Sequence, residues 1–154
     1  MLDENKWLQY GFPREKKDIL GITIHETGNV KMNAEELFDW FANVNKSSDG
    51  YHYICDDSQT IQVMPDDYGV YHTGKGLDWG NKYTIAIGIC SSLSNEKYKT
   101  AQDRAIDIIR ALQEKYSISD DMIFFHKSFN DRTYCPKTIL DRYGNVKRFI
   151  MEEL

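Results

Sequence analysis

Two histidines and one cysteine are the residues of this chain best suited to share a metal ion. His25 ends the apolar run 22–24, whereas His126 and Cys135 belong to one polar stretch about a hundred residues further along. Two imidazoles and a thiolate are three of the four ligands of tetrahedral zinc, and in catalytic sites water takes the fourth position. A structural site is normally closed by four protein ligands, often as two close pairs, and the sequence has no Cys-x-x-Cys or His-x3-His pair. The set therefore predicts a catalytic zinc.

The expected chemistry of such a site is hydrolysis. Two neutral imidazoles and one thiolate leave zinc with a net charge of about +1, which polarises a carbonyl group and lowers the pKa of a bound water toward neutrality. Cys55 and Cys90 lie in apolar runs, where a buried inert thiol is the usual interpretation. Cys135 instead sits in a polar, turn-rich stretch before Pro136, where packing does not call for it.

The elements that must position these side chains follow an α/β order. Apolar and β-branched runs predict strands over 19–25, 51–55, 61–64, 70–72, 84–90 and 122–126. Helical periodicity predicts helices over 33–45, 96–116 and 137–152, the first of them capped by Asn33. The turn at 56–59 separates two short apolar runs as in a hairpin, so residues 51–64 are expected to form an antiparallel pair. We therefore predict a single α/β domain with a central mixed β-sheet flanked by helices.

Length and composition indicate one globular domain over residues 1–154. The chain is 41% hydrophobic and 28% charged, with a formal net charge of −5. This acidic balance gives no electrostatic reason to expect binding to nucleic acid or to an anionic membrane. No apolar run has the length of a membrane-spanning helix, and residues 1–6 do not have the basic start of a secretion signal. Three cysteines exclude a complete disulfide framework and fit a reducing compartment.

Five segments carry a resemblance to a known family. In their order along the chain they resemble the type 2 N-acetylmuramoyl-L-alanine amidases, which include phage endolysins and bacterial autolysins and share their fold with peptidoglycan recognition proteins. The resemblance runs from about residue 19 to residue 140. Its motifs are Gly21–Thr27, Gly50–Ile54, Val70–Gly74, Ala86–Cys90 and His126–Pro136.

The resemblance implies a single zinc ion at the floor of a groove that accepts a glycan-linked stem peptide of peptidoglycan. His25, His126 and Cys135 match the family's three zinc-ligand positions. The implied reaction is hydrolysis of the amide bond between N-acetylmuramic acid and L-alanine. The alternative is a recognition module that binds muropeptides without cleaving them.

Further catalytic roles follow from the resemblance, with two departures from it. Tyr51 falls where many members carry a tyrosine whose hydroxyl assists at the metal, although a strand aromatic that only packs is an equal alternative. Phage members commonly have a lysine two positions before the cysteine ligand, where this chain has Thr133, with Arg132 before it. Either residue could stabilise an oxyanion, but neither is an effective general base at neutral pH. Cys90 stands where many bacterial members have a glutamate, and a thiol does not inherit that role.

Several other polar residues are candidates for the groove. His72, Thr73 and Asn29 are expected in loops near the site, where they could contact substrate. His52 is expected to point away from Tyr51 and its neighbour Tyr53, as a structural histidine in a regular strand. Trp79 suits either stacking on a sugar or covering the core.

The resemblance also implies where the protein works. We expect a lytic enzyme that stays in the host bacterial cytoplasm until a holin releases it to the cell wall, or one that is secreted if a leader has been removed. Because a pI of about 5.3 gives little attraction to an anionic wall, targeting should depend on groove contacts or on a separate wall-binding domain.

Overall fold

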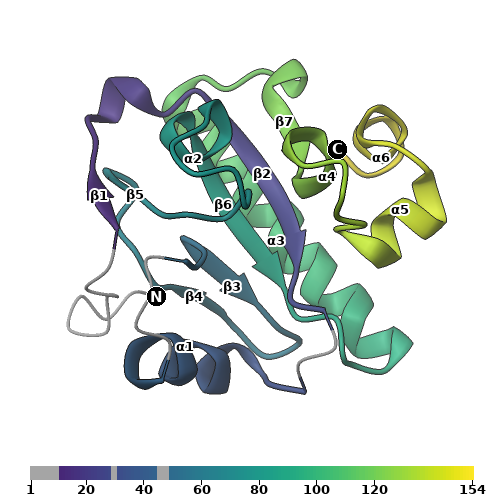
Figure 1. The fold of residues 1–154 in the computed structure, drawn as a ribbon. Helices are drawn as coiled ribbons and strands as arrows, with labels where there is room; N and C mark the ends of the chain where they lie inside the picture. The colour runs from purple at the N-terminus through teal and green to yellow at the C-terminus, as the bar shows by residue number, and fades with distance from the viewer. Residues whose placement is uncertain (1–10, 29–30, 45–48) are drawn as a thin grey trace.

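The computed structural model describes residues 11–28, 31–44 and 49–154, which form a mixed β-sheet with helices on both faces (Figure 1). The five-stranded sheet has the order β4-β3-β6-β2-β7. Its strands are β2 (Gly21–Glu26), β3 (Tyr53–Cys55), β4 (Thr60–Gln62), β6 (Thr84–Ile89) and β7 (Ile123–Phe125). A separate two-stranded sheet joins β1 (Phe12–Pro13) to β5 (Tyr68–Gly69). The predicted mixed α/β architecture is confirmed.

Parallel pairing at the centre of the sheet brings the ends of distant strands together. β6 and β7 both pair parallel with β2, and β3 pairs parallel with β6. β3 and β4 form the predicted antiparallel hairpin, in which Asp56 accepts backbone N–H bonds from Ser58 and Gln59. The second carboxylate oxygen of Asp56 accepts from the Ala34 amide at the start of α1 (Ala34–Asn43).

The central strands are buried on both faces, as expected for parallel strands covered by helices. Ile22 and Ile24 of β2 point into the core beneath the long helix α3 (Asn95–Tyr116). The opposite face of β2 carries Thr23 and His25, both fully buried. On that side of the sheet α1 packs on its own apolar cluster, and the predicted cap Asn33 accepts the Glu36 amide.

Two predicted elements were wrong. The helix expected over 137–152 is two helices, α5 (Lys137–Tyr143) and α6 (Val146–Glu153), because Gly144 adopts a φ of 82° between them. The strand expected over 70–72 is absent: the chain pairs earlier, in β5, and Tyr71 makes only an isolated bridge to Asp49.

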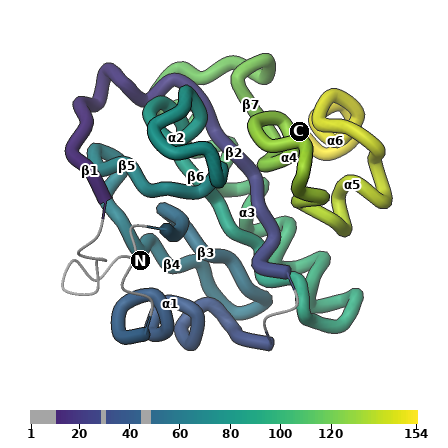
Figure 2. The backbone as a smooth tube through the Cα atoms, in the orientation of Figure 1, coloured from purple at the N-terminus to yellow at the C-terminus, as the bar shows by residue number. Residues whose placement is uncertain are grey.

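Four short helices escaped the sequence analysis, because one or two turns contain too few residues for a periodic pattern. They are the 3-10 helices Lys16–Asp18 and Asp120–Met122, with α2 (Trp79–Tyr83) and α4 (His126–Phe129). In the backbone trace α4 lies beside β2, although the two are far apart in the sequence (Figure 2). This contact brings His126 to the strand that carries His25.

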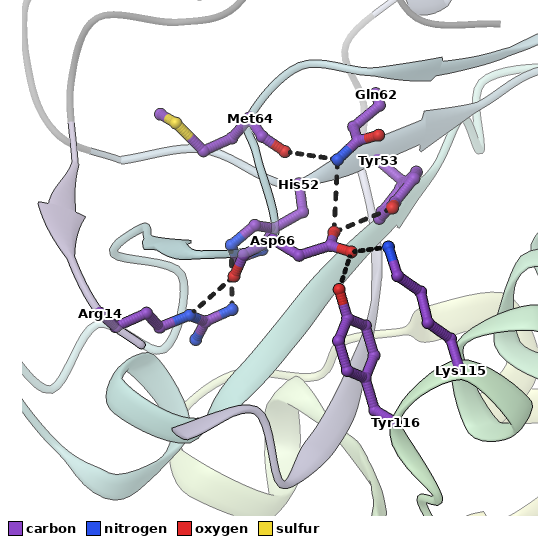
Figure 3. Close-up of polar contacts among 8 residues, drawn as sticks. All are labelled: Arg14, His52, Tyr53, Gln62, Met64, Asp66, Lys115 and Tyr116. Carbon is purple, nitrogen blue, oxygen red and sulfur yellow. Dashed lines mark hydrogen bonds and ion pairs between the residues drawn. The ribbon is translucent and has the colours of Figure 1, made fainter. Parts of the chain in front are cut away.

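A buried carboxylate ties the segment before β5 to α3 (Figure 3). Asp66 Oδ1 accepts hydrogen bonds from the Tyr53 hydroxyl at 2.9 Å and from Gln62 Nε2 at 3.3 Å. Asp66 Oδ2 accepts from the Tyr116 hydroxyl and lies 3.4 Å from Lys115 Nζ. Asp66 itself is only 7% exposed, and among its partners the Tyr53 hydroxyl is also buried, so little water can replace the carboxylate as the acceptor of that hydroxyl.

Replacing Asp66 with alanine is expected to lower the free energy of unfolding by about 3 kcal/mol, since the buried Tyr53 hydroxyl and the partly buried Tyr116 hydroxyl lose their acceptor. Urea denaturation followed by circular dichroism measures the change. Asp103→Ala is the matched control, because the Lys99–Asp103 ion pair is about half exposed and should contribute less than about 1 kcal/mol. Equal losses in the two variants would contradict the assigned role of Asp66.

His52 is a buried structural histidine, in agreement with the expectation. Its Nδ1 accepts the Ala86 N–H at 2.9 Å, so Nε2 carries the proton and donates to the Tyr68 carbonyl at 2.6 Å. The residues on either side, Tyr51 and Tyr53, were expected to share a face and do not, because regular strand geometry begins only at Tyr53. Tyr53 packs beneath α3, whereas Tyr51 lies with the cluster on the His25 face.

The buried state of His52 predicts a pH dependence of stability. Burial, together with the nearby Arg14 guanidinium, lowers the pKa of His52 well below its ordinary value of 6.5. As the pH falls below about 6.5, the unfolded chain takes up a proton at this residue and the folded chain does not, so the folded state loses stability. In metal-free protein, His52→Gln should make this slope shallower by at most about 1.4 kcal/mol per pH unit. Urea titrations between pH 5 and 7 measure it, and identical slopes would contradict the prediction.

Candidate metal centre and groove

A cavity of about 500 Å³ opens at the carboxyl ends of the parallel strands β2 and β7. His25 lies near the end of β2, and His126 directly follows β7. Ligand sites of α/β sheets commonly occupy this edge. His25, His126 and Cys135 all line the cavity, together with Tyr51 and Thr133.

The three residues expected to bind a metal come together. One side-chain donor atom from each of His25, His126 and Cys135 lies within 4.8 Å of the others. The ring centroids of the two histidines are 4.7 Å apart. Cys135 Sγ is placed by the Glu26 amide of β2, which donates to the sulfur at 3.3 Å. The sequence expectation of a shared site for these three side chains thus agrees with the geometry.

The protonation of His126 suits a metal ligand. Its Nε2 lies 3.0 Å from the Thr73 carbonyl oxygen, which can only accept, so Nε2 carries the proton. Nδ1 is then left with a free lone pair, and burial lowers the pKa of His126, which favours the neutral ring. A backbone carbonyl that orients the second nitrogen is the usual partner of a metal-binding histidine.

Burial has opposite effects on the other two donors. It lowers the pKa of His25 well below 6.5, which keeps this imidazole neutral, and raises the pKa of the Cys135 thiol to about 11. A thiol in this environment loses its proton when a divalent cation binds. Two neutral nitrogens and one sulfur in a partly buried site are a donor set that fits zinc.

Tyr51 lines the cavity beside His25, with 5.2 Å between the ring centroids. Gly88 of β6 makes this placement possible, because a Cβ on that glycine would stand 2.8 Å from the tyrosine ring. Burial raises the pKa of Tyr51, so its hydroxyl keeps the proton and remains a hydrogen-bond donor at neutral pH.

The two residues expected to replace the family lysine are placed differently. Thr133 lines the cavity, whereas Arg132 is exposed and does not contribute to the described lining. Asn130 shapes this turn, since its carbonyl accepts from the Thr133 amide and its Oδ1 from the Arg132 amide. Cys90 is buried in the cluster under α1, where burial raises the pKa of its thiol to about 12. It therefore offers neither a base nor a thiolate to the groove.

The three residues expected to contact substrate differ in where they lie. His72 lines the cavity but is 8% exposed, and its Nδ1 lies 2.9 Å from His25 Nε2. Thr73 is fully buried and does not line the cavity, and its carbonyl oxygen instead accepts the hydrogen bond from His126 Nε2. Asn29 lies outside the described residues. Trp79 is 38% exposed and packs against Phe129, at 6.1 Å between ring centroids.

Two supporting residues were missed by the sequence analysis. Asn81 is fully buried, accepts from the His72 and Thr73 amides, and donates to the Gly76 carbonyl. Glu26 accepts the Thr138 amide at 2.7 Å and thereby fastens the start of α5 to β2. In the sequence, each is only a polar residue next to an apolar run. That pattern does not show which group its side chain will bond to.

Comparison with known proteins identifies the class to which this fold and site belong. A family model described as N-acetylmuramoyl-L-alanine amidase matches residues 15–138, and the chain belongs to this family.

Among curated relatives, the N-acetylmuramoyl-L-alanine amidase CwlA of Bacillus subtilis (strain 168) is 36% identical over 137 residues, covering 86% of this chain and 49% of the relative. Among solved structures, PlyL is similar with a TM-score of 0.76 and 27% identity, covering 92% of this chain and 87% of that one. The catalytic domain of XlyA has a TM-score of 0.76 and 26% identity, with coverages of 89% and 87%. The chain spans about half the length of the curated relatives it matches. Among the described residues, no helix is both long and apolar enough to cross a membrane.

Proposed function

We propose that this chain is a zinc-dependent amidase that hydrolyses the bond between N-acetylmuramic acid and L-alanine in peptidoglycan, as the catalytic part of a phage endolysin or a bacterial autolysin. The observation that carries the proposal is the convergence of His25, His126 and Cys135 in the lining of one open cavity. Membership of the amidase family and the curated relative named as an amidase support it.

The two histidines and the cysteine would hold the zinc, which when bound supplies a Lewis acid and an activated water. The protein's own groups then act on the scissile amide. The Tyr51 hydroxyl, which keeps its proton and lies beside His25, would donate a hydrogen bond to the carbonyl oxygen as negative charge develops there. Thr133 offers a second hydroxyl from the lining of the same cavity.

A muropeptide-binding module is the second candidate function. It is favoured by one feature, the apolar burial of Cys90 where many family members carry a glutamate. The intact set of three metal donors favours the enzyme, since binding alone requires no nucleophile.

Digestion of purified peptidoglycan tests the two functions. Release of new N-terminal L-alanine amines without new reducing sugar ends, in proportion to bound zinc, would establish the amidase. Bound zinc and measurable muropeptide affinity with no cleavage of several wall types would instead support the binding module. New reducing ends would point to a glycosidase and overturn both.

The proposal also includes where the enzyme acts. We propose that it acts on the bacterial cell wall after holin-mediated release or secretion. Because the net charge of −5 provides no general attraction to an anionic wall, a further wall-binding domain would improve targeting. Fusion to such a domain should increase cleavage of whole cells more than cleavage of soluble muropeptides.

A further inference from the structure

A line of buried hydrogen bonds runs from His25 into the sheet. His25 Nε2 lies 2.9 Å from His72 Nδ1, and His72 Nε2 lies 3.3 Å from Thr84 Oγ1 at the start of β6. Thr84 Oγ1 also lies 2.7 Å from the Gly80 carbonyl oxygen and 2.7 Å from Thr23 Oγ1. All five residues are buried, so these groups depend on one another rather than on water.

The carbonyl at the end of this line determines the direction of every bond in it. Because the Gly80 oxygen can only accept, the single hydroxyl proton of Thr84 is donated to it. Thr84 Oγ1 then has two lone pairs for its other two neighbours. One accepts the hydroxyl proton of Thr23, and the other accepts the proton of His72 Nε2.

The tautomer of His72 in turn determines the tautomer of His25. A neutral imidazole has one N–H group and one lone pair, so a His72 ring protonated on Nε2 has its lone pair on Nδ1. That lone pair accepts the Nε2 proton of His25, which leaves the Nδ1 of His25 unprotonated. An imidazole binds a metal through its unprotonated nitrogen, and the hydrogen bond at the other nitrogen decides which one that is.

We propose that Thr84 is a positioning residue whose hydroxyl, by accepting from His72, fixes the tautomers of His72 and His25 and presents the Nδ1 lone pair of His25 to the metal. The metal part of this inference rests on the proposed function, whereas the tautomers are properties of the metal-free protein. Without the hydroxyl, His72 can move its proton to Nδ1, and His25 must then place its own proton on the nitrogen that should bind.

Three variants separate this role from simple packing. Thr84→Val keeps the shape and removes the acceptor, and Thr84→Ser keeps the hydroxyl and removes a methyl group. Thr23→Val is the matched control, since it removes a neighbouring buried hydroxyl that only donates to Thr84. Thermal denaturation establishes that each variant is folded before it is compared.

The first measurement is the ¹⁵N chemical shifts of the imidazole nitrogens in metal-free protein. In the wild type, the Thr84→Ser variant and the Thr23→Val variant, we expect protonated Nε2 and unprotonated Nδ1 for both His25 and His72. In the Thr84→Val variant we expect mixed or reversed tautomers. A wild-type His72 protonated on Nδ1 would overturn the proposal whatever the variants do.

The second measurement is zinc affinity by competition with a chelator. Thr84→Val should weaken zinc binding by about 10- to 100-fold, the usual effect of losing a group that orients a metal ligand, and Thr84→Ser should restore most of it. Wild-type affinity in Thr84→Val, or equal losses in the valine and serine variants, would overturn the proposal. If the protein failed to cleave peptidoglycan but showed these tautomers and affinities, only the proposed function would fall.

Discussion

Cys135→Ala is expected to lower the rate of peptidoglycan cleavage by at least about 1,000-fold, the largest effect we predict. The variant loses the only sulfur donor among His25, His126 and Cys135, so the zinc is bound weakly and in altered geometry. Activation by a metal contributes several kcal/mol to such a reaction, which corresponds to a rate factor of about this size. Release of L-alanine amines and zinc content per protein are measured on the same sample, and His126→Ala should behave alike.

Cys90→Ala is the matched control for this experiment. Its thiol is buried in the cluster under α1 and does not line the described groove. The control should lose some stability through a small cavity but keep zinc and turnover once folded. Full cleavage activity in zinc-free wild type, or in the Cys135→Ala variant, would exclude the metal mechanism.

Tyr51→Phe is expected to lower kcat by about 100-fold with zinc content unchanged, since one hydrogen-bond donor to the developing oxyanion is lost. The substituted ring keeps its place against Gly88 and beside His25, so KM should change little. Steady-state kinetics on a soluble muropeptide separate the two constants.

Tyr53→Phe is the control for the hydroxyl itself. Tyr53 lies two residues further along but donates to Asp66 beneath α3, far from the groove lining. It should lose about 1 kcal/mol of stability and keep kcat. If Tyr51→Phe turned over substrate as fast as this control, Tyr51 would be a packing aromatic, the alternative that the sequence allows.

The sequence predicted the sheet and the main helices where periodicity extends over several turns or a whole strand. Helix α3 and strands β2 and β6 lie close to their predicted ranges, and the turn around Asp56 produced the expected hairpin. Hydrophobic periodicity gave a wrong helix boundary where the backbone conformation of a single residue ended the helix. Residues 137–152 have continuous apolar spacing, but the positive φ of Gly144 divides them into two helices.

Residue type and sequence position identified the three candidate metal donors of this protein. His25, His126 and Cys135 combine an unusual thiol in a polar turn with histidines that follow apolar strands, and parallel pairing then places strand ends at one edge. Such pairings follow from local pattern and general rules of sheet topology. The family model covers all three of these residues.

Only the tertiary structure decided which atoms support those donors. The bonds from His126 to the Thr73 carbonyl and from His72 to the Thr84 hydroxyl join residues that no periodic pattern relates. Thr73 was expected in the groove and is buried, while Asn81 and Thr84 gave no functional signal. The physical reason is that hydrophobic periodicity reports which side chains avoid water, whereas the pairing of buried polar atoms depends on distances and directions that exist only after the strands and loops have packed.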